Sequence, residues 1–100
     1  MSLLDFTRTE QKRNPDHTGF KEVLIGSKRI RIVEYEEHAS HPDWCNTGHI
    51  GFVLEGEIMY ELEEGELKVK KGNGFILPSG TRHRGHNVFP GITRFFLIDE

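Results

Sequence analysis

Cysteine is almost absent from this sequence, which has one, Cys45, among 100 residues. A single thiol cannot form an internal disulfide, so a disulfide-stabilised scaffold is excluded and a reducing compartment is compatible with the sequence. Long apolar runs are also missing: no stretch approaches the roughly 20 apolar residues that a membrane-spanning helix needs. The N-terminus lacks an apolar segment followed by a cleavage site of small residues. We therefore expect a soluble, cytoplasmic protein with no membrane partner.

The sequence also has no strong excess of either charge. Lys and Arg number 13 against 16 Asp and Glu, a formal net charge of −3, and neither sign forms a long run. Nucleic-acid-binding domains normally concentrate basic residues on one face, so the composition argues against a nucleic-acid partner. A length of 100 residues predicts one domain, which can bury a core of its own without disulfides.

Helical periodicity is missing throughout. Short segments rich in β-branched and aromatic residues are instead separated by Gly, Pro and Asn, which is typical of antiparallel strands. In residues 57–63, for example, Ile58, Tyr60 and Leu62 alternate with more polar residues, which predicts one buried face. The predicted strands are residues 20–25, 28–36, 49–63 with a break at Gly56, 66–70, 75–77 and 92–99. The pattern predicts an all-β sandwich or closed barrel over residues 20–100, preceded by a polar N-terminal arm at residues 1–19.

One predicted strand is apolar on both faces. Ile50, Phe52 and Leu54 point to one side, and Gly51 and Val53 to the other. An antiparallel strand normally leaves one face to water, so the second apolar face predicts a cover. We expect a homodimer, with the second subunit or the N-terminal arm over this face.

Residues 72–87, GNGFILPSGTRHRGHN, contain turn and ligand residues at regular positions. Pro78 and Gly80 predict a tight turn after strand 75–77, from which the chain re-enters the sheet with His83. The full set is Gly72, Pro78, Gly80, His83 and Asn87. It matches, position for position, the second motif of the cupin superfamily. The chain resembles a small single-domain cupin over roughly residues 28–98, and the resemblance implies a cupin-type antiparallel β-barrel, or jelly roll.

The first cupin motif, normally H-x-H, a short gap, E, six residues and G, is only half present. His49 and Gly56 have the spacing of its end, so His49 stands where the family has a carboxylate ligand. Counting back with the shorter gap places Cys45 and Asp43 at the two histidine positions, whereas the longer gap gives Trp44 and Pro42, which do not ligate metals. The resemblance thus implies a metal site made of Asp43, Cys45, His49 and His83.

This ligand set is chemically coherent. Asp43, Cys45 and His49 are separated by even numbers of residues, so in an extended strand they share one face. A carboxylate, a thiolate and two imidazoles suit tetrahedral Zn²⁺, and Fe²⁺ or Ni²⁺ would also be accepted. In the alternative interpretation, Cys45 packs as a small apolar residue, Asp43 belongs to a turn and the histidines are only hydrogen-bonded. The other nearby histidines, His38, His41 and His86, are expected at the surface.

Two classes of function remain open. The first is a small metalloenzyme, of the isomerase, lyase or dioxygenase kinds that cupins include, whose metal polarises a carbonyl or carboxylate of a small polar ligand. The second is a non-catalytic module that binds or senses a small molecule without metal. A cysteine hydrolase built on Cys45 and His49 is disfavoured, because the sequence offers no helix whose N-terminus could stabilise an oxyanion. No catalytic residue is assigned.

Overall fold

The computed structural model describes residues 2–100, which form nine strands and a single-turn 3₁₀ helix, η1 (Phe6–Arg8). The strands are β1 (Lys12–Arg13), β2 (Thr18–Ile25), β3 (Lys28–Tyr35), β4 (His49–Glu55), β5 (Glu57–Leu62), β6 (Gly65–Lys70), β7 (Gly74–Leu77), β8 (His83–Asn87) and β9 (Thr93–Asp99). The all-β prediction is confirmed. No helix in residues 2–100 is long and apolar enough to cross a membrane.

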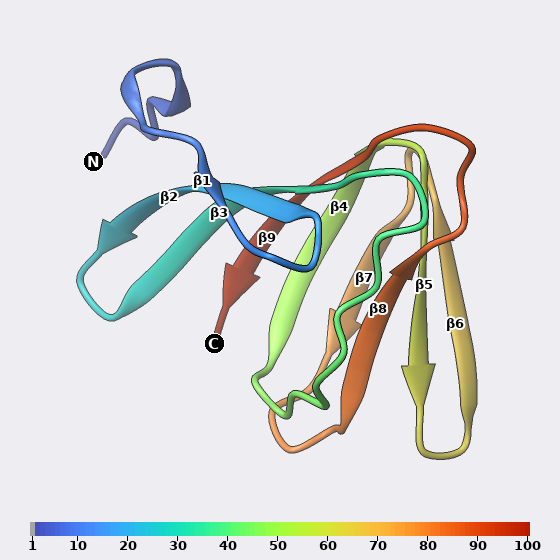
Figure 1. The fold of residues 1–100 in the computed structure, drawn as a ribbon. Coiled ribbons are helices and arrows are strands. Elements are labelled where there is room, and N and C mark those ends of the chain that lie inside the picture. The colour runs from blue at the N-terminus through green and yellow to red at the C-terminus, as the bar shows by residue number, and fades with distance from the viewer. Residues whose placement is uncertain (1) are drawn as a thin grey trace.

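The strands pair into two antiparallel sheets (Figure 1). One has six strands in the order β1-β2-β3-β9-β4-β7, and the other has three in the order β6-β5-β8. Within residues 2–100 no strand ladder joins the two sheets, so they form a two-layered jelly roll rather than a closed barrel. The long connection between β3 and β4 runs along β8, where it forms isolated bridges from Ser40 to His86 and from Cys45 to His83.

The core lies between the sheets and follows the predicted alternation. In β4 the side chain of Val53 is buried, whereas Phe52, on the other face, is 44% exposed. In β5 Ile58 and Tyr60 are buried and Leu62 is partly buried. Gly51 is required by close packing: a Cβ at this position would collide with the ring of Phe75 on the paired strand β7. The sheets are therefore held together by interdigitating side chains.

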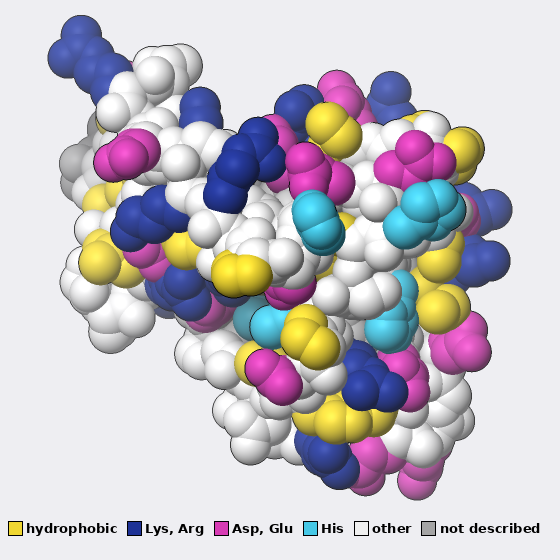
Figure 2. All heavy atoms as spheres, viewed as in Figure 1, with side chains coloured by type: hydrophobic (Ala, Val, Ile, Leu, Met, Phe, Trp, Pro, Cys, Tyr) yellow, Lys and Arg dark blue, Asp and Glu magenta, His cyan; other side chains and the backbone are white. Residues whose placement is uncertain are grey.

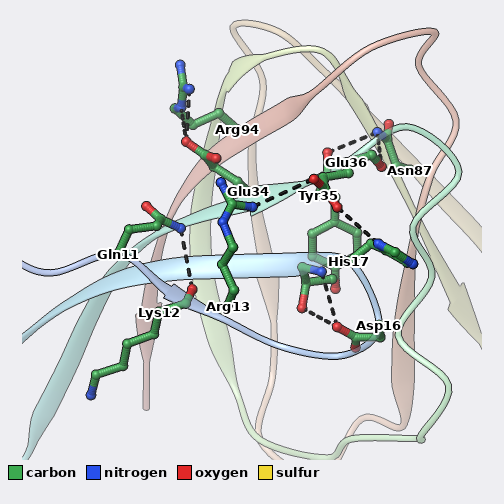
Figure 3. A network of polar contacts seen from close by, with 11 residues as sticks. Gln11, Lys12, Arg13, Asp16, His17, Glu34, Tyr35, Glu36, Asn87 and Arg94 are labelled. Atoms are coloured by element: carbon green, nitrogen blue, oxygen red, sulfur yellow. Dashed lines mark hydrogen bonds and ion pairs between the residues drawn. The ribbon is translucent and has the colours of Figure 1, made fainter.

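The asparagine of the second motif joins the ends of several strands. Buried Asn87 donates through Nδ2 to the backbone oxygens of Tyr35 (3.1 Å), Glu36 (2.9 Å) and Gly91 (2.7 Å). Its Oδ1 accepts from the Thr93 hydroxyl at 2.7 Å and from the backbone N–H of Phe89 at 2.9 Å. Figure 3 shows Asn87 beside Tyr35 and Glu36 at the end of β3. We assign Asn87 a structural role.

The N-terminal segment lies on the six-stranded sheet. Within it, β1 pairs with β2 at the sheet edge, and the ring of Phe6 lies 6.4 Å from that of Phe96 on β9. Strand β2 already begins at Thr18. The division into an arm at residues 1–19 and a domain at residues 20–100 stays a prediction, and residue 1 lies outside the described residues.

Candidate metal centre

A cavity of about 180 Å³ lies between the two sheets. Its wall combines cationic, imidazole, thiol and apolar groups with one carboxylate. The lining residues are Arg29, Arg31, Val33, Tyr35, His41, Cys45, Thr47, His49, Tyr60, His83, Arg84, Gly85, Phe95, Leu97 and Asp99. Figure 2 shows histidine side chains gathered over the middle of one face of the molecule, among charged side chains of both signs.

Three potential metal ligands meet in this cavity. Cys45, His49 and His83 each offer one ligand atom, and these atoms lie within 4.8 Å of one another. His49 begins β4 and His83 begins β8. Cys45 belongs to the β3–β4 connection, and its backbone exchanges two hydrogen bonds of 2.8 Å with that of His83. This bridge fixes the thiol beside the imidazoles.

The buried imidazole of His83 has the tautomer that a metal ligand requires. Its Nδ1 lies 2.8 Å from the carbonyl oxygen of Thr81. Since a carbonyl only accepts, Nδ1 bears the proton and Nε2 of the neutral ring has a free lone pair. Nε2 is buried without a hydrogen-bond partner. Burial is the main cause that lowers the pKa of His83, and the neighbouring His49 lowers it further, so the ring is neutral near pH 7.

The second imidazole, His49, is oriented by a carboxylate. Its Nδ1 lies 2.9 Å from Oδ1 of Asp99, although the contact is not aligned as a hydrogen bond. Arg31 Nη2 donates to both oxygens of Asp99, at 2.8 and 3.1 Å. Burial alone raises the pKa of Asp99, but His49 and Arg31 outweigh that effect and lower it to about 2. An ionised carboxylate behind a histidine is a common outer partner of metal-bound imidazole.

The thiol of Cys45 has one hydrogen-bond donor. The backbone N–H of Thr47 donates to Sγ at 3.4 Å. Next to it, Trp44 is flanked by the guanidinium groups of Arg82 and Arg84, with their Cζ atoms 4.8 and 4.4 Å from the ring centroid. This stacking holds the connection that contains Cys45 against β8.

Asp43 does not join the cluster. Its side chain is exposed, the chain bends at this residue, and β4 begins only at His49. The prediction that Asp43 shares a face with the ligands assumed one continuous strand, and that assumption is wrong. Cys45 reaches the cavity through its bridge to His83 instead.

The other polar residues of the site differ in how far the sequence could predict them. The side chain of His41 is 44% exposed, yet it lines the cavity. His86 does not line the cavity, and its ring forms hydrogen bonds with Ser40 and Glu61. Asp99 was not identified from the sequence. A signal was available, because Asp99 follows the inward-facing Phe95 and Leu97 of β9 at the two-residue spacing of one strand face.

Comparison with known proteins defines the family. The model of the cupin domain matches residues 31–99, so the chain belongs to the cupin family. No curated protein matches it. A predicted oxalate decarboxylase from Thermotoga maritima is similar in structure, with a TM-score of 0.82, 13% identity, and coverage of 98% of this chain and 97% of that one.

Two further solved structures show that this fold is shared widely. A sugar phosphate isomerase of the cupin superfamily from Silicibacter pomeroyi has a TM-score of 0.80 at 16% identity, covering 98% of this chain and 74% of that chain. The cupin domain of Cnp3 from Schizosaccharomyces pombe has a TM-score of 0.79 at 17% identity, covering 95% and 70%. At these identities the likeness shows the fold alone.

Proposed function

We propose that the protein binds a divalent transition metal through Cys45, His49 and His83, and a small polar molecule in the adjoining cavity. The observation that supports this best is the convergence of three ligand atoms within 4.8 Å, one of them the unpartnered, buried Nε2 of His83. A thiolate and two imidazoles suit Zn²⁺, Fe²⁺ or Ni²⁺.

Three protein ligands leave a coordination position for a small molecule, as in catalytic zinc sites. A bound metal would act as a Lewis acid on a carbonyl or carboxylate of that molecule. The contribution of the chain is orientation: Thr81 fixes the tautomer of His83, and Asp99 orients the ring of His49.

A non-catalytic binding module is the second candidate, because the ionisable oxygens of the cavity are poor proton acceptors. Burial raises the pKa of Tyr35 and of Tyr60, so both hydroxyls stay protonated near pH 7. Asp99 is ionised but engaged by His49 and Arg31, and with a pKa of about 2 it is a weak base. The proposed metal site belongs to the first candidate, and the second binds its ligand without metal.

Metal analysis of purified protein before and after chelation tests the proposal. We expect about one transition metal per chain, and the variant His83→Gln should lose at least about tenfold in metal affinity. His38→Asn is the matched control, because His38 is fully outside the cavity at φ 66°, a conformation that Asn tolerates. Absence of stoichiometric metal, or equal loss in both variants, would contradict the proposal.

We also propose that the protein forms a homodimer through the outer face of β4 and β7. Ile50, Phe52, Leu54 and Ile76 are 37–66% exposed there, whereas the β9 part of the same face is contacted by Phe6. A contiguous apolar face of this kind favours a partner surface. The cytoplasmic location stays a prediction.

A further inference from the structure

The unsatisfied polar atoms of this molecule are concentrated in one place. Among residues 2–100, the buried side-chain nitrogen and oxygen atoms without a hydrogen-bond partner are Arg31 Nε, His41 Nδ1, His49 Nδ1 and His83 Nε2. All four belong to residues that line the same cavity. A buried polar group without a partner is costly, so the cavity is suited to a ligand that supplies partners.

A metal can satisfy only part of this set. Nε2 of His83 can bind the proposed metal, whereas His49 Nδ1 lies 2.9 Å from Oδ1 of Asp99 and His41 Nδ1 lies 3.3 Å from Oδ2 of Asp16. Arg31 Nε is different, because a guanidinium nitrogen always bears a proton and cannot bind a cation. It needs an acceptor oxygen from the ligand.

Arg31 is the arginine of the cavity whose Nε is free. The Nε of Arg29 donates to Glu22, and the Nε of Arg84 donates to Glu61 at 2.8 Å. Arg31 uses Nη2 for Asp99, and its guanidinium lies 5.7 Å from the ring centroid of Phe20, which holds it in place. The donor is therefore held in position before a ligand arrives.

Arg31 also stands between two cavities. A second cavity of about 80 Å³ shares Arg31, Val33, Tyr35 and His41 with the first. It extends toward the polar side chains of Asn14 and Thr18, so a ligand bound at Arg31 has room on either side.

We propose that Arg31 binds the carboxylate of a small carboxylic acid in this cavity, an inference that rests on the proposed function for the location of the ligand. A monoanion adds the smallest charge to a lining whose arginines are already paired. The other two lining arginines are paired with Glu22 and Glu61, and the ionised Asp99 already shares Arg31. A dianionic phosphate would add more negative charge beside Asp99 than one shared guanidinium compensates.

The test uses lactate, its neutral amide lactamide, and inorganic phosphate, each titrated into ¹⁵N-labelled protein while the arginine Nε–H signals are followed by NMR. Lactate should shift the Arg31 signal saturably, and lactamide should bind at least about tenfold more weakly, because charge-assisted hydrogen bonds are the stronger ones. Equal binding of lactate and lactamide would overturn the proposal. Tighter binding of phosphate than of lactate would overturn the assignment to a carboxylate.

The variant Arg31→Lys should weaken lactate binding at least about tenfold, because a lysine has no planar fork for a carboxylate. Arg29→Lys is the matched control: Arg29 lines the same cavity and also contacts Asp99, but its Nε is already bonded to Glu22. Equal losses in the two variants would overturn the role of Arg31. If Arg31→Lys does not fold, the Nε–H titration of the wild-type protein still shows whether Arg31 binds lactate.

Titrations on chelated and on metal-loaded protein separate this inference from the proposed metal centre. Absence of metal binding would refute the metal centre, while a lactate-dependent shift of the Arg31 signal in the chelated protein would still support the inference. Metal binding without any lactate-dependent shift in either form would refute the inference alone.

Discussion

Asp99→Asn is expected to destabilise the protein in a pH-dependent way. The pKa of Asp99 falls from an ordinary 3.8 to about 2, and one pKa unit corresponds to about 1.4 kcal/mol. The ionised carboxylate, whose side chain is only 12% exposed, therefore stabilises the fold by about 2 kcal/mol. Since the pKa is lower in the folded protein than in the unfolded chain, this stabilisation is fully present above pH 3.8 and is lost as the pH falls toward 2.

This contribution is measured by urea unfolding of wild-type and Asp99→Asn protein, both treated with a chelator, at a series of pH values. The difference in the free energy of unfolding should be about 2 kcal/mol near pH 7 and should shrink as the pH falls through the range from 3.8 to 2. A difference that stays constant over this range would refute the electrostatic account. It would mean that the substitution acts through packing.

Three other substitutions test the fold and the assembly. Asn87→Ala, which removes the hydrogen bonds that join the strand ends, should lower the free energy of unfolding by about 3 kcal/mol or more, and a loss below about 1 kcal/mol would argue against the structural role. Gly51→Ala should cost about 1–3 kcal/mol through collision with Phe75, whereas Gly74→Ala on the same pair of strands should cost less; equal costs would contradict the close packing. Phe52→Lys should convert the dimer to a monomer in light scattering, and a monomeric wild-type protein would contradict the dimer.

Local patterns in the sequence predicted most of the fold. The two-residue spacing of Ile58 and Tyr60 placed them correctly in the core, because a strand has a period of two and its burial is a local property. The spacing of the second motif predicted the turn before β8 and the return of His83 to the sheet. Strand β8 itself, HRGHN, has no apolar alternation, because its inward positions are His83, Gly85 and Asn87.

The site was less predictable because it depends on pairings between distant segments. Arg31 and Asp99 meet only because β3 pairs with β9 in a particular register, and register between strands far apart in sequence has no local signal. Cys45 enters the cavity through a bridge to His83 from outside any strand, so parity counted from β4 does not apply to it or to Asp43. The spacing of the motifs named Cys45, His49 and His83 as candidate ligands, whereas it gave no indication of their partner Asp99.

Titration with Co²⁺ tests the metal centre most directly, since a thiolate ligand gives a charge-transfer absorption that oxygen and nitrogen ligands do not. We expect this band at one equivalent of Co²⁺ in the wild-type protein and its loss in Cys45→Ser, in which a hydroxyl replaces the sulfur that lies beside His49 and His83. The variant should unfold at nearly the same urea concentration as the wild type, because Cys45 is only partly buried. Saturation of the wild-type protein with Co²⁺ without a charge-transfer band, or no binding at all, would contradict the account.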